Sequence, residues 1–410
     1  MGTRRGLTDL ETTMEDNHVW VMAADGSGRR ELGAALDNRQ GAASWAPDGR
    51  SIYCTVQERG HVRLFELPLV GSPVAVVSTD GRVGDYSLSS LGTLAYSFTS
   101  RSDLAQLYAV ELKQRGAPGR RGVASASPPA ARRLTDLNAE VFRDVETAAV
   151  ESFRFASNDF KFDVEAFLTK PVGLTPGSTH PLVVMIHGGP HGQQGPQYNF
   201  KSQFYAHRGY ATLQVNFRGS TGYGQKFADA VFGDQNGNEA QDVLYGVSAA
   251  LRRNPWLDRD RVGVEGTSYG GQLSAWLVTQ THLFKAAIPL AGIVNNLSYN
   301  YMTYYNMYEQ MEWGVLPHQG NLMDVLWERS ALKHVARVKT PTMLVHGEND
   351  NDVPIAESEQ FFIALKDVGV ETVMVRYPRE GHGLAEPGHI VDLMDRSLAF
   401  YEKQFARVSR

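Results

Sequence analysis

Apolar runs alternate with helical runs in the second part of the chain, and this rhythm constrains the fold more than any other feature. The apolar runs lie at residues 181–187, 211–217, 261–266, 285–292, 341–347 and 370–378. The helical runs lie at residues 239–253, 270–281, 356–367 and 388–407. Continuous apolar strands separated by helices indicate an α/β fold with a mostly parallel sheet covered on both faces. Such folds place their sites at the carboxyl ends of the strands.

The first 145 residues have a different rhythm, of short strands separated by turns. Strand-like runs include HVWVM at 18–22, SIYCTV at 51–56 and QLYAVEL at 106–112. Trp45 and Tyr86 open two similar units 41 residues apart, a spacing that fits four-stranded propeller blades. The sequence predicts about two and a half to three blades, with a generic antiparallel sheet as the alternative.

This blade count is low, because propellers close with roughly four to eight blades. An open set leaves strand edges and an apolar face exposed. We therefore expect either the C-terminal part of a longer protein or a shortened propeller, and an open face favours a homo-oligomer. The change of rhythm divides the chain into a partial propeller at 1–145 and a second domain at 146–410.

The composition is that of an ordinary globular protein, with 42% hydrophobic and 21% charged residues. The net charge of -5 argues against nucleic acid or an anionic membrane as partner. No apolar run is long enough for a transmembrane helix. The lone Cys54 excludes an intrachain disulfide and a cysteine-based zinc site. The polar N-terminus lacks the apolar segment of a secretory signal, so we expect a cytoplasmic location.

One motif that carries chemistry is GTSYGG at 266–271, which lies between a strand-like run and a helical run. It fits the G-x-S-x-G pattern, in which a sharp strand-to-helix turn projects the serine hydroxyl from the sheet. Side chains two residues to either side of the serine would clash with neighbouring elements. The motif predicts Ser268 as a nucleophile; the alternative is a glycine-rich turn that happens to hold a serine.

A serine nucleophile in this context needs an acid and then a histidine later in the chain. Asp350 follows the run 341–347, and His382 follows the run 370–378. The imidazole accepts the hydroxyl proton, and the carboxylate fixes its tautomer and stabilises the imidazolium. Asp352 competes for the role of orienting acid, but the spacing favours Asp350. His346 lies within a strand, ahead of the carboxylate, and we interpret it as structural.

Backbone amides are expected to stabilise the oxyanion of a tetrahedral intermediate. The amide of Tyr269, directly after the nucleophile, is one candidate donor. The loop after the run 181–187 supplies Gly189 as the second donor, with Gly188 as the next choice, because glycine lets the backbone approach a substrate closely. A plain Gly-Gly-Pro turn is the alternative. We expect no cofactor and no metal, since the chain contains no H-E-x-x-H zinc motif.

The motifs form a set that resembles the prolyl oligopeptidase family. The set comprises HGGPH at 187–191, NFRGSTGYG at 216–224, GTSYGG at 266–271, HGENDNDVP at 346–354 and EGHG at 380–383. The acylaminoacyl-peptidase-like branch, related to the dipeptidyl peptidases, fits best, because His-Gly-Gly-Pro stands where other branches carry an oxyanion tyrosine. The resemblance implies an α/β-hydrolase domain behind a β-propeller that restricts substrates to short peptides. By position it assigns the triad to Ser268, Asp350 and His382, and the oxyanion hole to Tyr269 and Gly189.

The resemblance also implies a substrate pocket. The aromatic stretch 299–314 lies where related peptidases line that pocket, so Tyr304 and Tyr308 are candidates, with Val353 in the S1 wall. The alternative is that these side chains only pack the core or a loop. Within the segment 216–224, we expect Arg218 to pair with a carboxylate of the domain.

Together these observations predict a serine peptidase that hydrolyses short peptides through an acyl-enzyme and releases blocked or free N-terminal residues. An esterase with the same triad is the first alternative. A catalytically idle, propeller-containing fragment that survives as a binding module is the second. The intact set of catalytic residue types argues against an idle fragment.

Overall fold

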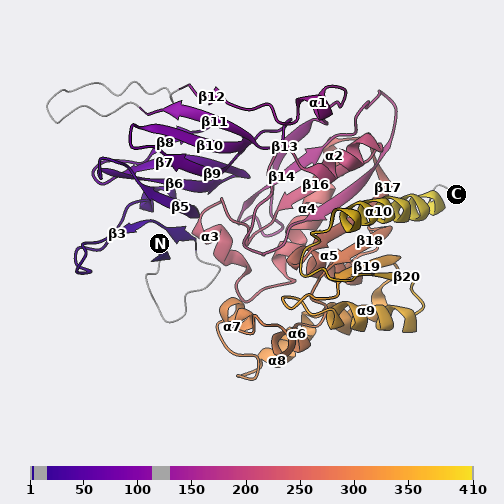
Figure 1. Cartoon of the computed structure of the whole chain (residues 1–410). Coiled ribbons are helices and arrows are strands. Elements are labelled where there is room, and N and C mark those ends of the chain that lie inside the picture. Colours follow the sequence, from indigo (N-terminus) through magenta and orange to yellow (C-terminus); the bar gives the residue numbers. More distant parts are fainter. Residues whose placement is uncertain (1, 4–15, 113–129, 409–410) are drawn as a thin grey trace.

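Two large sheets form the frame of the molecule. The computed structural model describes residues 2–3, 16–112 and 130–408 (Figure 1). The residues on which the cytoplasmic prediction rests lie mostly outside these ranges. The first sheet ends at Arg133 and the second begins at Val150, so the predicted boundary at 145/146 falls between them. No helix within the described ranges has the length and apolarity needed to cross a bilayer.

The first sheet consists of two four-stranded antiparallel meanders. One contains β5 (Gln40–Trp45), β6 (Ser51–Glu58), β7 (His61–Pro68) and β8 (Val74–Val77). The other contains β9 (Arg82–Leu88), β10 (Thr93–Thr99), β11 (Gln106–Glu111) and β12 (Arg132–Arg133). A parallel bridge between Val62 and Arg82 joins the meanders. Each meander has the form of a propeller blade, so the predicted partial propeller is confirmed.

Short elements precede these blades, and the blades have cores of their own. They are β1 (Gly2–Thr3), β2 (Asn17–His18), β3 (Trp20–Val21), β4 (Arg30–Glu31) and the 3₁₀ helix η1 (Ala34–Leu36). Leu64, Leu94 and Val110 are buried in one cluster of the blades, and Cys54 is buried in another. Burial raises the pKa of the Cys54 thiol to about 12, which fits the inert, structural thiol of a core position.

The second sheet is mostly parallel, with strand order β13-β14-β16-β15-β17-β18-β19-β20. Its strands are β13 (Val150–Ala156), β14 (Asp163–Thr169), β15 (His180–Ile186), β16 (Ala211–Asn216), β17 (Leu257–Thr267), β18 (Ala286–Leu290), β19 (Thr342–Gly347) and β20 (Thr372–Tyr377). Strands β13 and β14 pair antiparallel, and β14 pairs antiparallel with β16. The six strands from β15 onward match the predicted apolar runs, whereas the β13–β14 hairpin was not predicted.

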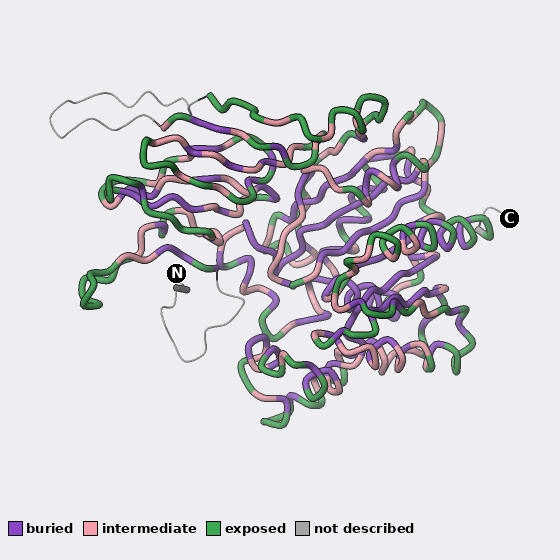
Figure 2. The backbone as a smooth tube through the Cα atoms, viewed as in Figure 1, coloured by how far each residue is buried: buried purple, intermediate pink, exposed green. Residues whose placement is uncertain are grey.

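Helices cover both faces of this sheet, as the alternation predicts. The helices are α1 (Ala139–Phe142), α2 (Phe200–His207), α3 (Gln225–Ala228), η2 (Asp229–Val231), α4 (Asn238–Arg253), α5 (Tyr269–Gln280), α6 (Asn296–Met302), α7 (Tyr308–Trp313), α8 (Leu322–Glu328), η3 (Ala331–Arg337), α9 (Ala356–Asp367) and α10 (Pro387–Val408). Helices α4, α5 and α9 share one core with Val184, while α2 and α10 share the opposite core with Val183. The purple strands in Figure 2 show how continuously these two cores bury the sheet.

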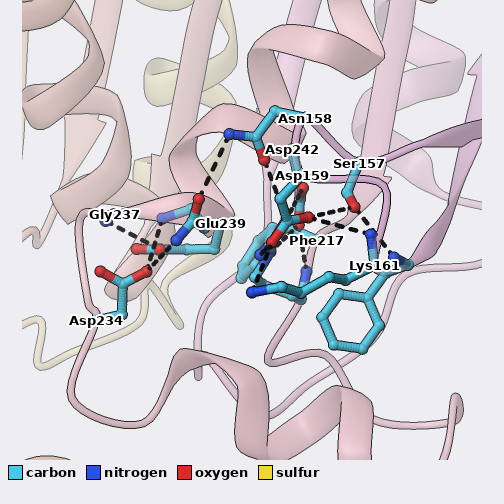
Figure 3. A network of polar contacts seen from close by, with 12 residues as sticks. Ser157, Asn158, Asp159, Lys161, Phe217, Asp234, Gly237, Glu239 and Asp242 are labelled. Atoms are coloured by element: carbon cyan, nitrogen blue, oxygen red, sulfur yellow. Dashed lines mark hydrogen bonds and ion pairs between the residues drawn. The ribbon is translucent and has the colours of Figure 1, made fainter.

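Arg218, directly after β16, is buried and pairs with two carboxylates, as the sequence predicted. Its guanidinium donates to both oxygens of Asp242 on α4 at 2.8 Å, and to Asp159 in the β13–β14 turn at 3.0 and 3.1 Å. Figure 3 shows the surroundings of Asp159 and Asp242. The hydrogen bond from Arg218 holds the pKa of Asp159 well below its usual range. This network ties the antiparallel hairpin to the parallel part of the sheet.

Replacing Asp242 should destabilise the fold strongly, because in Asp242→Ala the buried charge of Arg218 keeps Asp159 but loses the Asp242 carboxylate. We expect a loss of about 3 kcal/mol in the free energy of unfolding, measured by urea denaturation. Asp163→Ala is the control, since Asp163 forms an exposed pair with Arg154 at 3.5 Å and should cost less than about 1 kcal/mol. Equal losses in both variants would contradict the network's role.

Candidate active site

Ser268 occupies the sharp turn between β17 and α5. Its φ of 62° and ψ of -123° lie in a region that residues other than glycine rarely adopt. The Ser268 amide donates to the carbonyl of Leu290 at 2.9 Å, and the Gln272 amide donates to the carbonyl of Ser268 at 2.9 Å. These bonds hold the strained turn in place, so the nucleophile-elbow geometry predicted from G-x-S-x-G is present.

The glycines around Ser268 are required by close backbone contacts. A Cβ on Gly266 would lie 2.6 Å from the carbonyl carbon of Gly270 and from the oxygen of Ile186. A Cβ on Gly270 would overlap Ile186 as well, and one on Gly271 would overlap the carbonyl oxygen of Leu290. These contacts are with backbone, which has little room to yield. The expected clash of any larger residue at these positions is therefore confirmed.

His382 and Asp350 meet at the carboxyl ends of β20 and β19. His382 Nδ1 donates to Asp350 Oδ2 at 2.8 Å. Asp350 Oδ1 accepts from the backbone amides of Asp352 and Val353, each at 2.9 Å. Asp352 Oδ2 instead lies 3.7 Å from His382 Nε2, on the other side of the ring. The geometry thus gives Asp350 the contact of an orienting acid, as the spacing predicted.

The charges of this pair follow from its contacts. Burial favours the neutral form of Asp350, but bonds from His346 and His382 outweigh it and hold the pKa of Asp350 well below its usual range. Burial also opposes the imidazolium of His382, yet Asp350 and then Asp352 raise the pKa of His382 above its ordinary value. His346 Nε2 donates to the carbonyl of Val353 at 2.7 Å, which fits the structural role expected for this histidine.

Ser268 and His382 are not joined by a hydrogen bond among the residues that the structure describes. Asp352 lies near both residues: its Oδ2 is 3.7 Å from His382 Nε2, and its side chain lines the same cavity as Ser268. Catalytic hydrogen bonds are often long in ligand-free enzymes and tighten when substrate binds. The structure therefore joins Asp350 and His382 directly and places Ser268 in the cavity that Asp352 also lines.

The two expected oxyanion donors flank Ser268. Tyr269 is the first residue of α5, so its amide has no acceptor within the helix. Gly189 lines the same cavity as Ser268 and has a φ of 130°, where a Cβ would lie 2.5 Å from the His191 amide. A Cβ on Gly188 would lie 3.1 Å from Ser268 Cβ, so this loop presses directly against the elbow.

The side chain of Tyr269 anchors the start of α5. Its hydroxyl donates to Glu239 Oε1 at 2.8 Å, and Glu239 Oε2 accepts from the Gly237 amide at 3.0 Å. Figure 3 shows Glu239 beside Gly237. Burial raises the pKa of Glu239 to about 7. A fixed Tyr269 side chain fixes its amide too, which is what a preorganised donor needs.

A cavity of about 180 Å³ opens beside Ser268. Its lining comprises Gly189, Ser268, Tyr269, Ile293, Tyr299, Tyr304, Tyr305, Tyr308, Asp352 and Val353. The three pocket candidates Tyr304, Tyr308 and Val353 are all present. Tyr304 is exposed at the mouth, whereas Tyr308 and Val353 are buried. Sequence reasoning missed Ile293, Tyr299 and Tyr305, although the two tyrosines belong to the aromatic stretch 299–314 that indicated the pocket.

The His382 loop is braced by a second carboxylate. Glu380 accepts from the amides of Ala385 and Glu386 at 2.8 and 2.9 Å, and from His389 Nδ1 at 2.7 Å. Among the described residues, one possible cation-binding cluster consists of Glu380, Glu386 and His389, whose ligand atoms lie close together. Since the Glu380 oxygens already accept these bonds, the cluster is accounted for as a brace of the loop that carries His382.

Comparison with known proteins gives the class to which this fold and site belong. Residues 196–407 match the model of the prolyl oligopeptidase family, peptidase family S9, and the chain belongs to that family. It is 33% identical over 346 residues to the uncharacterized peptidase YuxL of Bacillus subtilis, covering 84% of this chain and 50% of that protein. It is 31% identical over 243 residues to the acylamino-acid-releasing enzyme of Mus musculus, covering 58% of this chain and 32% of that enzyme.

Solved structures agree with the fold. The acylaminoacyl peptidase of Pyrococcus horikoshii aligns with a TM-score of 0.85 and 26% identity, covering 97% of this chain and 61% of that structure. The chain thus spans half the length of the Bacillus subtilis relative and about a third of the mouse enzyme. These likenesses confirm an α/β-hydrolase fold preceded by a partial propeller.

The pKa of His382 offers a direct check of the site's electrostatics. Because Asp350 and Asp352 stabilise the imidazolium, an NMR titration of the histidine rings should give His382 a pKa above 6.5. Asp352→Asn should lower this pKa, and Asp350→Asn should lower it further, because Asp350 supplies both a hydrogen bond and a charge. The resonance is assigned with His382→Gln. A pKa at or below 6.5 in the unsubstituted chain would contradict the assignment.

Proposed function

We propose that this chain is a serine peptidase that cleaves short peptides through an acyl-enzyme, with Ser268 as nucleophile, His382 as general base and Asp350 as orienting acid. One observation carries the proposal: the strained elbow serine, Gly189 and Asp352 line one cavity, and Asp352 lies 3.7 Å from the ring of His382, whose other nitrogen pairs with Asp350. Membership of the prolyl oligopeptidase family supports it.

The chemistry follows from these contacts. Ser268 Oγ attacks the scissile carbonyl while His382 Nε2 takes the hydroxyl proton, and Asp350 stabilises the resulting imidazolium. The oxyanion accepts hydrogen bonds from the amides of Tyr269 and Gly189. His382 then gives its proton to the leaving amine, and a water activated by the same imidazole hydrolyses the acyl-enzyme. Since only neutral His382 can accept the proton, the rate should fall as the pH drops through its raised pKa.

The cavity favours an apolar or aromatic side chain next to the scissile bond. Ile293, Tyr299, Tyr308 and Val353 supply buried apolar walls. The names of the relatives, acylamino-acid-releasing enzyme and dipeptidyl-peptidase 5, support action near the N-terminus of a peptide. We infer that the substrates are short peptides with a blocked or free N-terminal residue, and that no cofactor takes part.

Substitutions of Asp350 and Asp352 should lower kcat to different extents. Asp350→Asn should lower kcat by about 10⁴-fold, because the imidazole loses the acceptor that fixes its tautomer. Asp352→Asn should lower kcat less than about tenfold, since Asp352 contributes a charge at 3.7 Å and no hydrogen bond. The Ser268→Ala variant gives the background rate of the assay. If Asp352→Asn abolished turnover while Asp350→Asn did not, the roles would be reversed.

A substrate panel should separate the peptidase from its alternatives. We expect turnover of p-nitrophenyl esters and also of acyl-alanyl or aminoacyl anilides, with a preference for aromatic residues in the acyl part. Turnover of esters without cleavage of any anilide would favour an esterase. The folded chain should also be labelled at Ser268 by a fluorophosphonate, with Ser268→Ala as the control. Failure to label would favour the catalytically idle fragment.

A further inference from the structure

A buried imidazole–carboxyl pair, His191 and Glu312, lies next to Gly189. We call the loop 187–192, which carries Gly189, the oxyanion loop. His191 follows Gly189 by two residues, and its Nε2 lies 3.4 Å from Glu312 Oε1 on α7. The side chain of His191 is only 5% exposed and that of Glu312 is fully buried. Neither atom makes a hydrogen bond within the described residues, so the 3.4 Å contact is the polar contact that the structure gives them. Buried polar groups of this kind are costly unless they act on one another.

The other ring nitrogen fixes what the pair can do. His191 Nδ1 lies 2.8 Å from the carbonyl oxygen of Gly219, and a carbonyl can only accept, so Nδ1 carries a hydrogen. Nε2 therefore faces Glu312 either as the N–H of an imidazolium or as the acceptor of the proton of a carboxylic acid. In both forms the contact between the two side chains at 3.4 Å is attractive.

The pair connects two walls of the active site. The oxyanion loop carries Gly189, and α7 carries Tyr308, which lines the cavity beside Ser268. The carbonyl of Glu312 accepts from the Gly233 amide at 2.9 Å, which anchors α7 in turn. Through its imidazole, His191 reaches this helix at Glu312.

Two further bonds hold the backbone of the loop, while the ring of His191 contacts both the Gly219 carbonyl and Glu312. Arg39 of the N-terminal part donates to the carbonyl of His191 at 3.1 Å. The Thr221 amide donates to the carbonyl of Gly192 at 2.8 Å. Both bonds act C-terminal to Gly189, on the carbonyls of the loop. The imidazole of His191 thus joins the loop to α7, which carries part of the pocket wall.

We propose that Glu312, acting through His191, is a positioning residue that holds the Gly189 amide where the oxyanion forms. This rests on the proposed peptidase function. Because the oxyanion exists only in the transition state, a displaced Gly189 amide should lower kcat and leave KM nearly unchanged. A purely structural role would instead show itself in stability.

The test compares near-isosteric variants of the full chain in a p-nitrophenyl ester assay. Glu312→Leu should lower kcat about 10- to 100-fold with KM within twofold, because leucine offers His191 no polar partner. Glu312→Gln should restore most of kcat, because its amide can donate to His191 Nε2. Glu309 is also buried on α7, where burial and Glu312 raise its pKa, and it has no contact with His191 among the described residues. Glu309→Leu is therefore the matched control and should keep kcat within threefold.

Several outcomes would overturn the proposal. These are equal losses of kcat in Glu312→Leu and Glu309→Leu, a rise in KM that accounts for the loss, or no recovery in Glu312→Gln. If Glu312→Leu does not fold, His191→Phe keeps a ring but removes both nitrogens, and with them the contacts to Gly219 and Glu312, and should give at least the same kcat loss. If the unsubstituted chain neither turns over an ester nor is labelled at Ser268, the peptidase function fails, and the pair is not its cause.

Discussion

The close approach of backbone to backbone at the start of α5 is the constraint on which the rest of the site depends. Ser268 is forced to a positive φ because Gly266, Gly270 and Gly271 let α5 press against the ends of β15 and β18. Nearly the whole of α5 is buried in the main core, so the helix cannot retreat to relieve the turn. The packing of the domain thus maintains the strain that presents the hydroxyl.

The carboxyl groups around this elbow differ in their pKa because their surroundings differ. Asp350 stays charged although it is buried, because two amides and two imidazoles contact it. Glu239, with fewer such contacts, has a pKa raised to about 7 and anchors Tyr269 instead. Imidazole partners thus lower the pKa of Asp350, while burial raises that of Glu239, and the two carboxyls take different roles.

The N-terminal blades contact the hydrolase part close to the oxyanion loop. Gln193 accepts from the Gly60 amide at 2.9 Å and donates to the carbonyl of His61 at 2.8 Å. The Arg59 amide donates to the carbonyl of Gly222 at 2.9 Å. These bonds join the hairpin between β6 and β7 to the two loops that follow β15 and β16. The blades thus brace the catalytic side of the sheet.

The sequence by itself determined the α/β frame, the elbow at Ser268 and the order of acid and histidine, because apolar periodicity and glycine spacing act locally along the chain. It missed the β13–β14 hairpin, whose first strand has little continuous apolar character and whose edge position leaves β13 partly exposed. The spacing favoured Asp350 over Asp352, and the tertiary structure added their different contacts, 2.8 and 3.7 Å on opposite ring nitrogens of His382. It alone brought Glu312 to His191, since residues so distant in sequence meet only when helices and loops pack together in three dimensions.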